Sequence, residues 1–235
     1  PRSGLDVDIS LDNRLAIHNS MMLKSYAQEE RLQRLIQVVK YWASRRGINN
    51  AFEGTLSSYA WTLLSIQHAQ LVQPPLAPNR QEDVDSNPLS FKGTTYDVGY
   101  SDEHYATENN QSLASLLISF FDRFATRWDW ENMVVSVRSG EALSTKSKKW
   151  QHTGPLPLEV VTGADDGWME HVMPIEDPFN HEHDLSRVVR AEGAMTIQNE
   201  FMRIIELLSK GSSWKDICEP VMDIEEETSD LFHDL

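Results

Sequence analysis

Apolar residues recur at helical spacing along much of the chain, and the clearest case is the stretch 29–47. Gly47 is a suitable residue to end this helix. One face of the predicted helix carries the apolar side chains that would pack on a core, namely Leu32, Leu35, Ile36, Val39, Trp42 and Ala43. The same spacing predicts further helices over residues 14–27, 54–71, 112–127 and 194–211.

The last of these predicted helices, over residues 194–211, would turn Phe201, Ile204, Ile205 and Leu208 inward. The helix within residues 54–71 would begin at Ser57 or Ser58, because a serine side chain caps a helix start well.

Between the helices, the pattern changes to strands and irregular segments. Residues 4–10 alternate apolar and polar side chains, which predicts a strand, and residues 132–140 are also strand-like. Residues 168–190 are expected to run from a strand through a turn to the start of a helix. Long segments rich in Pro, Asp, Asn and Ser over 72–110, and irregular over 146–167, predict loops with little structure of their own.

Composition narrows the classes of protein that remain. The chain has 235 residues and a formal net charge of −15, which argues against a general DNA-coating protein but not against an enzyme that holds one nucleotide and one RNA end. Cys218 is the single cysteine, so no internal disulfide forms and a reducing compartment is expected. No signal peptide is visible, and the longest apolar stretch, 113–121, is too short to span a bilayer.

Several polar positions could carry chemistry. Asp6 and Asp8 lie on one face of the first predicted strand, where they suit a divalent metal ion or simply form the exposed face of an edge strand. Lys40, Ser44 and Arg45 lie within about a turn of one another, so they fit a phosphate contact or a solvated helix face.

The predicted helix start near Ser58 combines hydroxyls with an aromatic residue, Tyr59. Helix N-termini bind phosphate, although an ordinary serine cap with a core tyrosine gives the same sequence. Further along, His181 and His183 stand among acidic residues and suggest zinc. No cysteine or distant histidine motif supports that site, and a polar Asp-Pro turn is the plainer interpretation.

Taken together and in order, these stretches resemble one family. The segments DVDISLDNRLAIHNS, VVKYWASRRGIN, EGTLSSYAWTLL, QPPLAPN and IEDPFNHEHDLSRVV are similar to the C-terminal two-thirds of a terminal uridylyltransferase. These enzymes are poly(A)-polymerase-like members of the DNA polymerase β nucleotidyltransferase superfamily. The resemblance runs from about residue 5 to about residue 220, and it is the joint set of motifs that makes it specific.

The resemblance implies a metal site at the start of the chain. Three aspartates of the family hold two Mg²⁺ (or Mn²⁺) ions, and Asp8 matches the third of them, whereas Asp6 matches no ligand. The Gly-Ser loop and the other aspartate pair are not among these 235 residues, so the chain alone is expected to be inactive.

The resemblance also implies contacts to a nucleoside triphosphate. Asn13 and Asn19 would lie along the ribose, with Asn19 near its 2′-hydroxyl and the base. Ser20 and Ser58 would touch the triphosphate, and Lys40 would pair with its β/γ end. The family often has a second lysine where this chain has Ser44, with Arg45 beside it.

For the base, Tyr59 matches the stacking aromatic residue and Asp177 matches the acidic residue that reads the uracil edge. His183 matches the histidine associated with UTP preference, and Arg187 is expected to anchor this loop. A second acidic residue of the family is replaced here by Asn180.

The predicted fold is α+β: residues 1–14 end a catalytic palm, residues 15–220 form a mostly helical central and PAP-associated domain with a small strand-bearing recognition loop, and residues 221–235 form an acidic tail. The resemblance implies that the full-length protein is a cytoplasmic, monomeric RNA uridylyltransferase, which adds UMP from UTP to single-stranded RNA 3′ ends by two-metal phosphoryl transfer. An ATP-using poly(A) or other terminal transferase, or a non-catalytic nucleotide- or RNA-binding module, remains the alternative.

Overall fold

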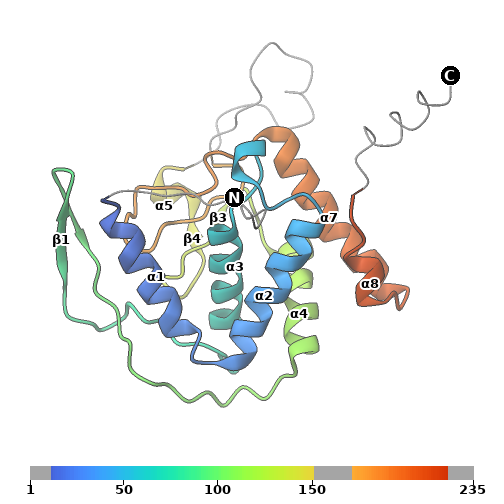
Figure 1. The fold of residues 1–235 in the computed structure, drawn as a ribbon, viewed down its shortest axis with the longest axis horizontal. Coiled ribbons are helices and arrows are strands. Elements are labelled where there is room, and N and C mark those ends of the chain that lie inside the picture. Colours follow the sequence, from blue (N-terminus) through green and yellow to red (C-terminus); the bar gives the residue numbers. More distant parts are fainter. Residues whose placement is uncertain (1–11, 151–170, 222–235) are drawn as a thin grey trace, which may run out of the picture.

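The computed structural model describes residues 12–150 and 171–221 (Figure 1). Most of the described chain is helical, with two small antiparallel sheets beside the helices, as the α+β prediction requires. The helices are α1 Arg14–Tyr26, α2 Glu30–Arg45, α3 Ser58–Leu71, α4 Leu113–Asp122, α5 Thr145–Lys148, α7 Ala191–Ser209 and α8 Trp214–Ile217. The strands are β1 Pro88–Phe91, β2 Thr94–Asp97, β3 Met133–Val134 and β4 Leu143–Ser144.

A serine cap starts α3 where the sequence predicts it. The Ser57 side chain accepts a hydrogen bond from the backbone N–H of Ala60 at 3.2 Å, so α3 begins at Ser58. Asn13 caps α1 in the same way, by accepting from the backbone N–H of Ala16. Gly47 follows the end of α2 with a φ of +66°, a conformation that glycine adopts without steric cost.

The core lies where α2, α3, α4 and α7 meet (Figure 1). The predicted face of α2 is confirmed, with Leu32, Leu35, Val39, Trp42 and Ala43 buried. Aromatic rings pack edge-on around Trp42, whose ring centroid lies 5.4 Å from that of Trp61 and 4.9 Å from that of Phe121. In α3 every residue from Ala60 to Gln70 is buried, because other elements cover this helix on all sides.

Helix α7, Ala191–Ser209, begins earlier than predicted and buries Phe201 and Ile204 fully. The other two side chains expected to point inward, Ile205 and Leu208, are partly buried and pack against the core. At its first turn α7 crosses the α2–α3 connection closely. A Cβ atom on Gly193 would lie 2.0 Å from the carbonyl oxygen of Gly54, and the same oxygen accepts a hydrogen bond from the Arg190 N–H at 2.9 Å.

The predicted helix 112–127 is not one continuous α-helix. It is α-helical to Asp122 and then widens into a π-turn over Arg123–Arg127. The Arg123 side chain turns back from this wider turn. Its Nε donates to His68 Nδ1 at 3.0 Å, and its Nη2 donates to the Leu71 carbonyl at 3.3 Å. The helical periodicity of the sequence does not predict this change of winding. At the π-turn Arg123 donates a hydrogen bond to a histidine on another helix, and a local pattern does not contain such a contact.

His68 itself is fully buried in α3. Because its Nδ1 accepts from Arg123, its Nε2 carries the proton and faces Ser119 Oγ at 3.1 Å. Burial, together with the positive charge of Arg123, lowers the pKa of His68 to about 3. The group is therefore a neutral structural histidine in the core.

The segment 72–110 has more structure than its composition predicts. Strands β1 and β2 form a hairpin that pairs Pro88 with Asp97 and turns at Lys92 and Gly93, both with positive φ. The expectation of a loop without its own structure is wrong for this part. A two-residue turn of this kind needs positive φ at both central positions, and the sequence supplies glycine at only one of them.

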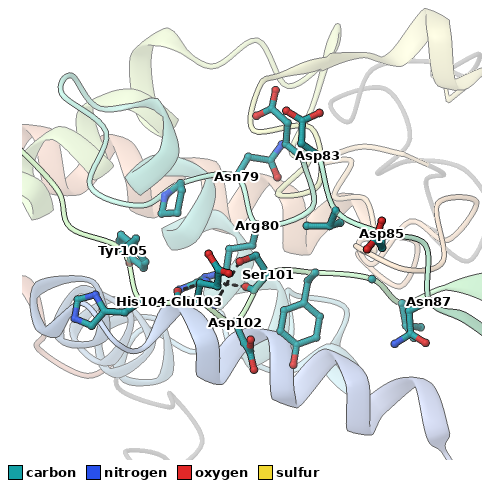
Figure 2. Close-up of a pocket in the computed structure, with 16 residues that line it drawn as sticks. Asn79, Arg80, Asp83, Asp85, Asn87, Ser101, Asp102, Glu103, His104 and Tyr105 are labelled. Atoms are coloured by element: carbon teal, nitrogen blue, oxygen red, sulfur yellow. Dashed lines mark hydrogen bonds between the residues drawn. The ribbon is translucent and has the colours of Figure 1, made fainter.

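A buried arginine holds the remainder of this segment in place. Arg80 donates to the carbonyl oxygens of Ser101 at 2.7 Å, Glu103 at 3.0 Å and Ser25 at 2.8 Å. Its guanidinium also lies against the rings of Tyr26 and Tyr105. The segment encloses an open cavity of about 630 Å³ lined by acidic side chains, among them Asp83, Asp85 and Asp102 (Figure 2).

Some predictions fall on residues outside the described part of the chain. They include the strand 4–10 with Asp6 and Asp8, most of the predicted palm segment 1–14, and the acidic tail after Val221. The domain boundaries therefore stay predictions. Within the described residues, no helix combines the length and apolar character that a membrane crossing requires.

Candidate functional site

The predicted base-recognition residues come together where α1, the start of α3 and the loop 177–183 meet. Asn19 on α1 donates from Nδ2 to Asp177 Oδ2 at 3.3 Å, which joins positions 158 residues apart in the sequence. This contact fixes the orientation of the Asn19 amide. Its Oδ1 is buried and has no hydrogen-bond partner among residues 12–150 and 171–221, so it remains an acceptor for a ligand.

The loop 177–183 is a hydrogen-bonded turn built around the Asp177 carboxylate. Asp177 Oδ1 accepts from the backbone N–H groups of Phe179 at 3.0 Å and Asn180 at 2.9 Å. The loop closes through the Asp177 N–H to the His183 carbonyl at 3.1 Å and the His183 N–H to the Asn180 carbonyl at 2.8 Å. The predicted Asp-Pro turn is therefore present, and it leaves Oδ2 of Asp177 for Asn19.

Tyr59, at the second position of α3, is close to the same carboxylate. Its side chain is half-buried, and its hydroxyl oxygen is not exposed to solvent. Burial, followed by the negative charge of Asp177, raises the pKa of this hydroxyl. Tyr59 therefore offers a neutral ring beside Asp177, and its stacking on a base stays a prediction.

His183 is half-buried at the end of the loop. Burial, and then the positive charge of Arg187, lowers its pKa, so the ring is neutral at neutral pH. The guanidinium of Arg187 is exposed and forms no hydrogen bond or ion pair with the described residues. The expected anchoring of the loop by Arg187 is therefore not seen there.

The residues predicted to touch the triphosphate have local partners or none. Ser58 Oγ exchanges hydrogen bonds with the Asn49 amide at 2.9 and 3.1 Å, and Ser20 Oγ donates to the Ala16 carbonyl. Both serines are exposed. Lys40 is half-buried and makes no hydrogen bond or ion pair within residues 12–150 and 171–221, so its ammonium remains available for an anion.

Arg45, which could have replaced the second lysine of the family, is partly engaged elsewhere. Its Nε donates to the Cys218 carbonyl at 3.3 Å, next to α8. Asn13 is exposed, and its side chain serves as the cap of α1.

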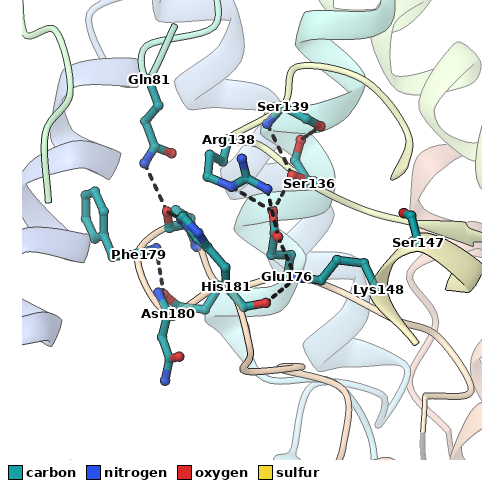
Figure 3. Close-up of polar contacts among 12 residues, drawn as sticks. Gln81, Ser136, Arg138, Ser139, Ser147, Lys148, Glu176, Phe179, Asn180 and His181 are labelled. Atoms are coloured by element: carbon teal, nitrogen blue, oxygen red, sulfur yellow. Dashed lines mark hydrogen bonds and ion pairs between the residues drawn. The ribbon is translucent and has the colours of Figure 1, made fainter. Parts of the chain in front are cut away.

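A buried carboxylate next to Asp177 holds the loop, and the sequence analysis missed it. Glu176 accepts hydrogen bonds from Ser136 Oγ at 2.5 Å, from Arg138 Nη2 at 3.0 Å and from Lys148 Nζ at 3.0 Å (Figure 3). We call these four residues the Glu176 cluster. The one available signal was the pair of adjacent acids in IEDP, since neighbouring strand residues point to opposite sides.

The predicted zinc alternative finds no support in the described residues, which contain no group of three or more His, Cys, Asp or Glu side chains placed to hold a metal. Asp184 Oδ1 instead accepts a hydrogen bond from the Ile175 N–H at 3.0 Å, and Asp184 Oδ2 lies 2.7 Å from His171 Nδ1. The predicted magnesium ligand, Asp8, lies outside the described residues, so its fit to a metal stays a prediction.

A sequence profile described as Cid1 family poly A polymerase matches residues 112–183, from the start of α4 to the end of the loop. Among curated proteins, terminal uridylyltransferase cid1 of Schizosaccharomyces pombe is 34% identical over 218 residues, which cover 87% of this chain and 51% of that protein. Poly(A) RNA polymerase GLD2 of Xenopus tropicalis is 28% identical over 207 residues, covering 86% and 35%. The chain spans about half the length, or less, of these relatives.

Solved structures give the same likeness in three dimensions. A structure of a cytoplasmic RNA terminal U-transferase matches with a TM-score of 0.78 and 31% identity, covering 94% of this chain and 68% of that one. A structure of Cid1 with the UTP analogue UMPNPP matches with a TM-score of 0.75 and 30% identity, covering 89% and 63%.

Proposed function

This chain belongs to the Cid1 family of poly(A) polymerases, which are terminal nucleotidyltransferases, and from that premise we propose that it is part of an RNA 3′-terminal uridylyltransferase. One observation carries the proposal. The Asn19–Asp177 hydrogen bond places an amide and a carboxylate side by side, near Tyr59. Asp177 lies in the same loop as His183.

The polar groups at this point suit the edge of uracil. Uracil presents a donor, N3–H, between two carbonyl acceptors, and the Asp177 carboxylate can accept from that donor. Adenine presents the acceptor N1 near the corresponding position, which a carboxylate repels. The neutral His183 ring favours the smaller base by occupying space beside the loop. Stacking on Tyr59 adds about 1–3 kcal/mol for any base and does not discriminate.

The buried Oδ1 of Asn19 can accept from a ribose 2′-hydroxyl, a group that deoxyribose lacks. Asn13 would lie further along the same sugar. The triphosphate would meet the hydroxyls of Ser20 and Ser58 and the ammonium of Lys40, which would neutralise part of its negative charge.

In the proposed reaction the RNA 3′-hydroxyl attacks the α-phosphate of UTP and pyrophosphate leaves. The described residues bind and orient the nucleotide, which is the main way that proteins accelerate phosphoryl transfer. A Mg²⁺ or Mn²⁺ ion held by Asp8 would supply charge neutralisation at the phosphates. A single-stranded RNA 3′ end as partner, a monomeric protein without membrane attachment and a cytoplasmic location belong to the same proposal.

The second candidate is an adenylyl or other terminal transferase, or a non-catalytic binding module. Asn180 favours the ATP-using alternative, because its neutral amide both donates and accepts where the resemblance expects an acid. Poly(A) RNA polymerases among the relatives are consistent with that choice.

A nucleotide competition separates these functions. The full-length protein would be offered UTP, ATP, CTP and GTP on one RNA primer with Mg²⁺. Uridylyl transfer predicts preferred addition of UMP, and His183→Ala should reduce the UTP:ATP ratio. His104→Ala, which changes an exposed histidine in the segment 72–110, is the matched control and should leave the ratio unchanged.

Preferred addition of AMP would favour the adenylyl alternative over the proposal. If the full-length protein added no nucleotide, the non-catalytic binding module would be the remaining function. The 235-residue chain alone should add none, since it carries a single residue of the expected metal triad.

A further inference from the structure

We propose that Glu176 is a positioning residue for nucleotide selection: the Glu176 cluster holds the loop 177–183 so that Asp177 meets Asn19 and the base. The inference rests on the proposed function, because it concerns the same base site. Glu176 itself faces away from that site and would not touch the nucleotide.

The Glu176 carboxylate at the centre of the cluster is buried, and both of its oxygens are hydrogen-bonded. The Glu176 side chain has no exposed surface, and both of its oxygens accept hydrogen bonds, Oε2 from Ser136 and Arg138 Nε, and Oε1 from Arg138 Nη2 and Lys148. Burial by itself would raise the pKa of Glu176, but the hydrogen bonds from Arg138 and Ser136 outweigh it, so the pKa lies below its usual range. The carboxylate therefore stays charged and keeps its partners at neutral pH.

The donors come from segments that are distant in the sequence. Ser136 and Arg138 follow β3, and Lys148 ends α5. Lys148 Nζ also donates to the carbonyl oxygen of His181, at the far side of the loop (Figure 3). The one ammonium group thus connects the residue before the loop with a residue inside it, which restrains the turn between these two residues.

The backbone transmits this restraint to Asp177. Glu176 is extended, with its N–H bonded to the Val135 carbonyl at 2.9 Å and a bridge to Asp184. Successive side chains of extended backbone point to opposite sides. Because Glu176 is held on one side by its cluster, Asp177 is directed to the other, where Asn19 lies.

A fixed carboxylate matters for selection more than for binding in general. Hydrogen-bond readout of a base edge depends on position within tenths of an ångström, whereas stacking on Tyr59 tolerates displacement. Loosening the cluster should therefore lower the efficiency of addition of the preferred nucleotide and leave the efficiency for the other nucleotides nearly unchanged. If the ion pair were purely structural, its loss would instead lower the stability of the protein and reduce the addition of all nucleotides alike.

The helical core offers a matched control. Glu200 is also a buried carboxylate between two cations, with Arg46 Nη2 at 2.7 Å and Arg203 Nε at 2.9 Å, but it lies on α7 and outside the base site. Glu176→Gln and Glu200→Gln remove the same charge from similar surroundings. Comparing them separates a general loss of stability from a specific loss of selection.

The test measures single-nucleotide addition from UTP and from ATP by the full-length protein and by both variants, with unfolding midpoints recorded alongside. We expect Glu176→Gln to reduce the ratio of UTP to ATP efficiency about tenfold or more, as expected for loss of one oriented hydrogen bond. Glu200→Gln should change that ratio less than about twofold at a similar loss of stability. An unchanged ratio in folded Glu176→Gln, or equal changes in both variants, overturns the proposal.

If Glu176→Gln does not fold, Lys148→Met replaces it, because this variant keeps the Arg138–Glu176 pair and removes the Lys148 contacts to Glu176 and to the His181 carbonyl. Lys148→Arg should restore part of the lost ratio, since it keeps a cationic donor. The two proposals fail in different ways. A wild-type preference for ATP contradicts the uridylyl function, yet positioning by Glu176 then still predicts loss of whichever preference the wild type has.

Discussion

The helical core and the start of the loop 177–183 are both buried, but different forces hold them in place. Around Trp42 the contacts are aromatic and aliphatic, and the rings of Trp61, Phe121 and Phe201 surround it. Beneath the loop the contacts are hydrogen bonds and ion pairs that converge on the Glu176 carboxylate. The core depends on area removed from water, and the loop depends on the direction of individual bonds.

This difference explains why the two regions suit different tasks. Apolar packing tolerates small shifts of side chains and supplies most of the stability. Oriented polar contacts add little net stability, because each one replaces a hydrogen bond to water, but they specify position. A site that must tell one base edge from another is therefore built on the second kind of region and supported by the first.

The largest expected effect comes from opening the core. Trp42→Ala should lower the free energy of unfolding by about 3–5 kcal/mol, because it removes a fully buried indole and leaves a cavity. Urea unfolding followed by circular dichroism measures the change. Tyr41→Ala, at the neighbouring exposed position, is the control and should cost far less. Equal losses in the two variants would contradict the assignment of the core.

An intermediate effect tests the polar exception within the core, His68. In the unfolded chain His68 has a pKa near 6.5, whereas in the folded chain burial and Arg123 lower the pKa to about 3. Its stability contribution is therefore present above about pH 6.5 and is lost as the pH falls toward 3, at up to about 1.4 kcal/mol per pH unit.

The control for this acid sensitivity is His68→Gln, which cannot titrate but keeps hydrogen-bonding groups for Ser119 and Arg123. Stability measured between pH 7 and pH 4 should fall more steeply for the wild type than for the variant. Parallel curves would mean that His68 is not the neutral, buried group described above. His183, whose pKa burial also lowers, adds to the slope of both proteins equally.

The smallest expected effect comes from one hydrogen bond to the loop. Gln81 donates from Nε2 to the Pro178 carbonyl at 2.9 Å, so Gln81→Ala should cost about 0.5–1.5 kcal/mol. Hydrogen exchange should speed up in residues 177–183 and remain unchanged in α3. Gln28→Ala removes a similar bond, to the Asp102 carbonyl at 3.0 Å, and should leave exchange in the loop unaltered. Faster exchange in α3 as well would contradict a local role.

The core was predictable from the sequence because it follows from periodicity. The spacing from Leu32 to Ala43 and the serine cap at Ser57 both depend on residues close together in the chain. Of the predicted site, Asn19, Tyr59 and Asp177 lie together in the structure, and the family resemblance rather than the pattern selected them.

The remainder depends on contacts between distant segments, which a local pattern does not contain. At the π-turn Arg123 contacts His68 of another helix, and in the Glu176 cluster Lys148 and Arg138 meet a carboxylate from another segment. The β1–β2 hairpin was missed for a local reason, since Lys92 adopts positive φ without the usual residue for it.

The close crossing of Gly54 and Gly193 has a consequence for how this sequence can vary. The loop 177–183 is joined to α7 by residues 184–190, while Gly54 lies four residues before the start of α3. The close contact between the two glycines thus connects the segment that carries Asp177 with the segment that carries Tyr59. In a saturation library, position 193 should therefore reject even alanine, although neither glycine would touch nucleotide or RNA.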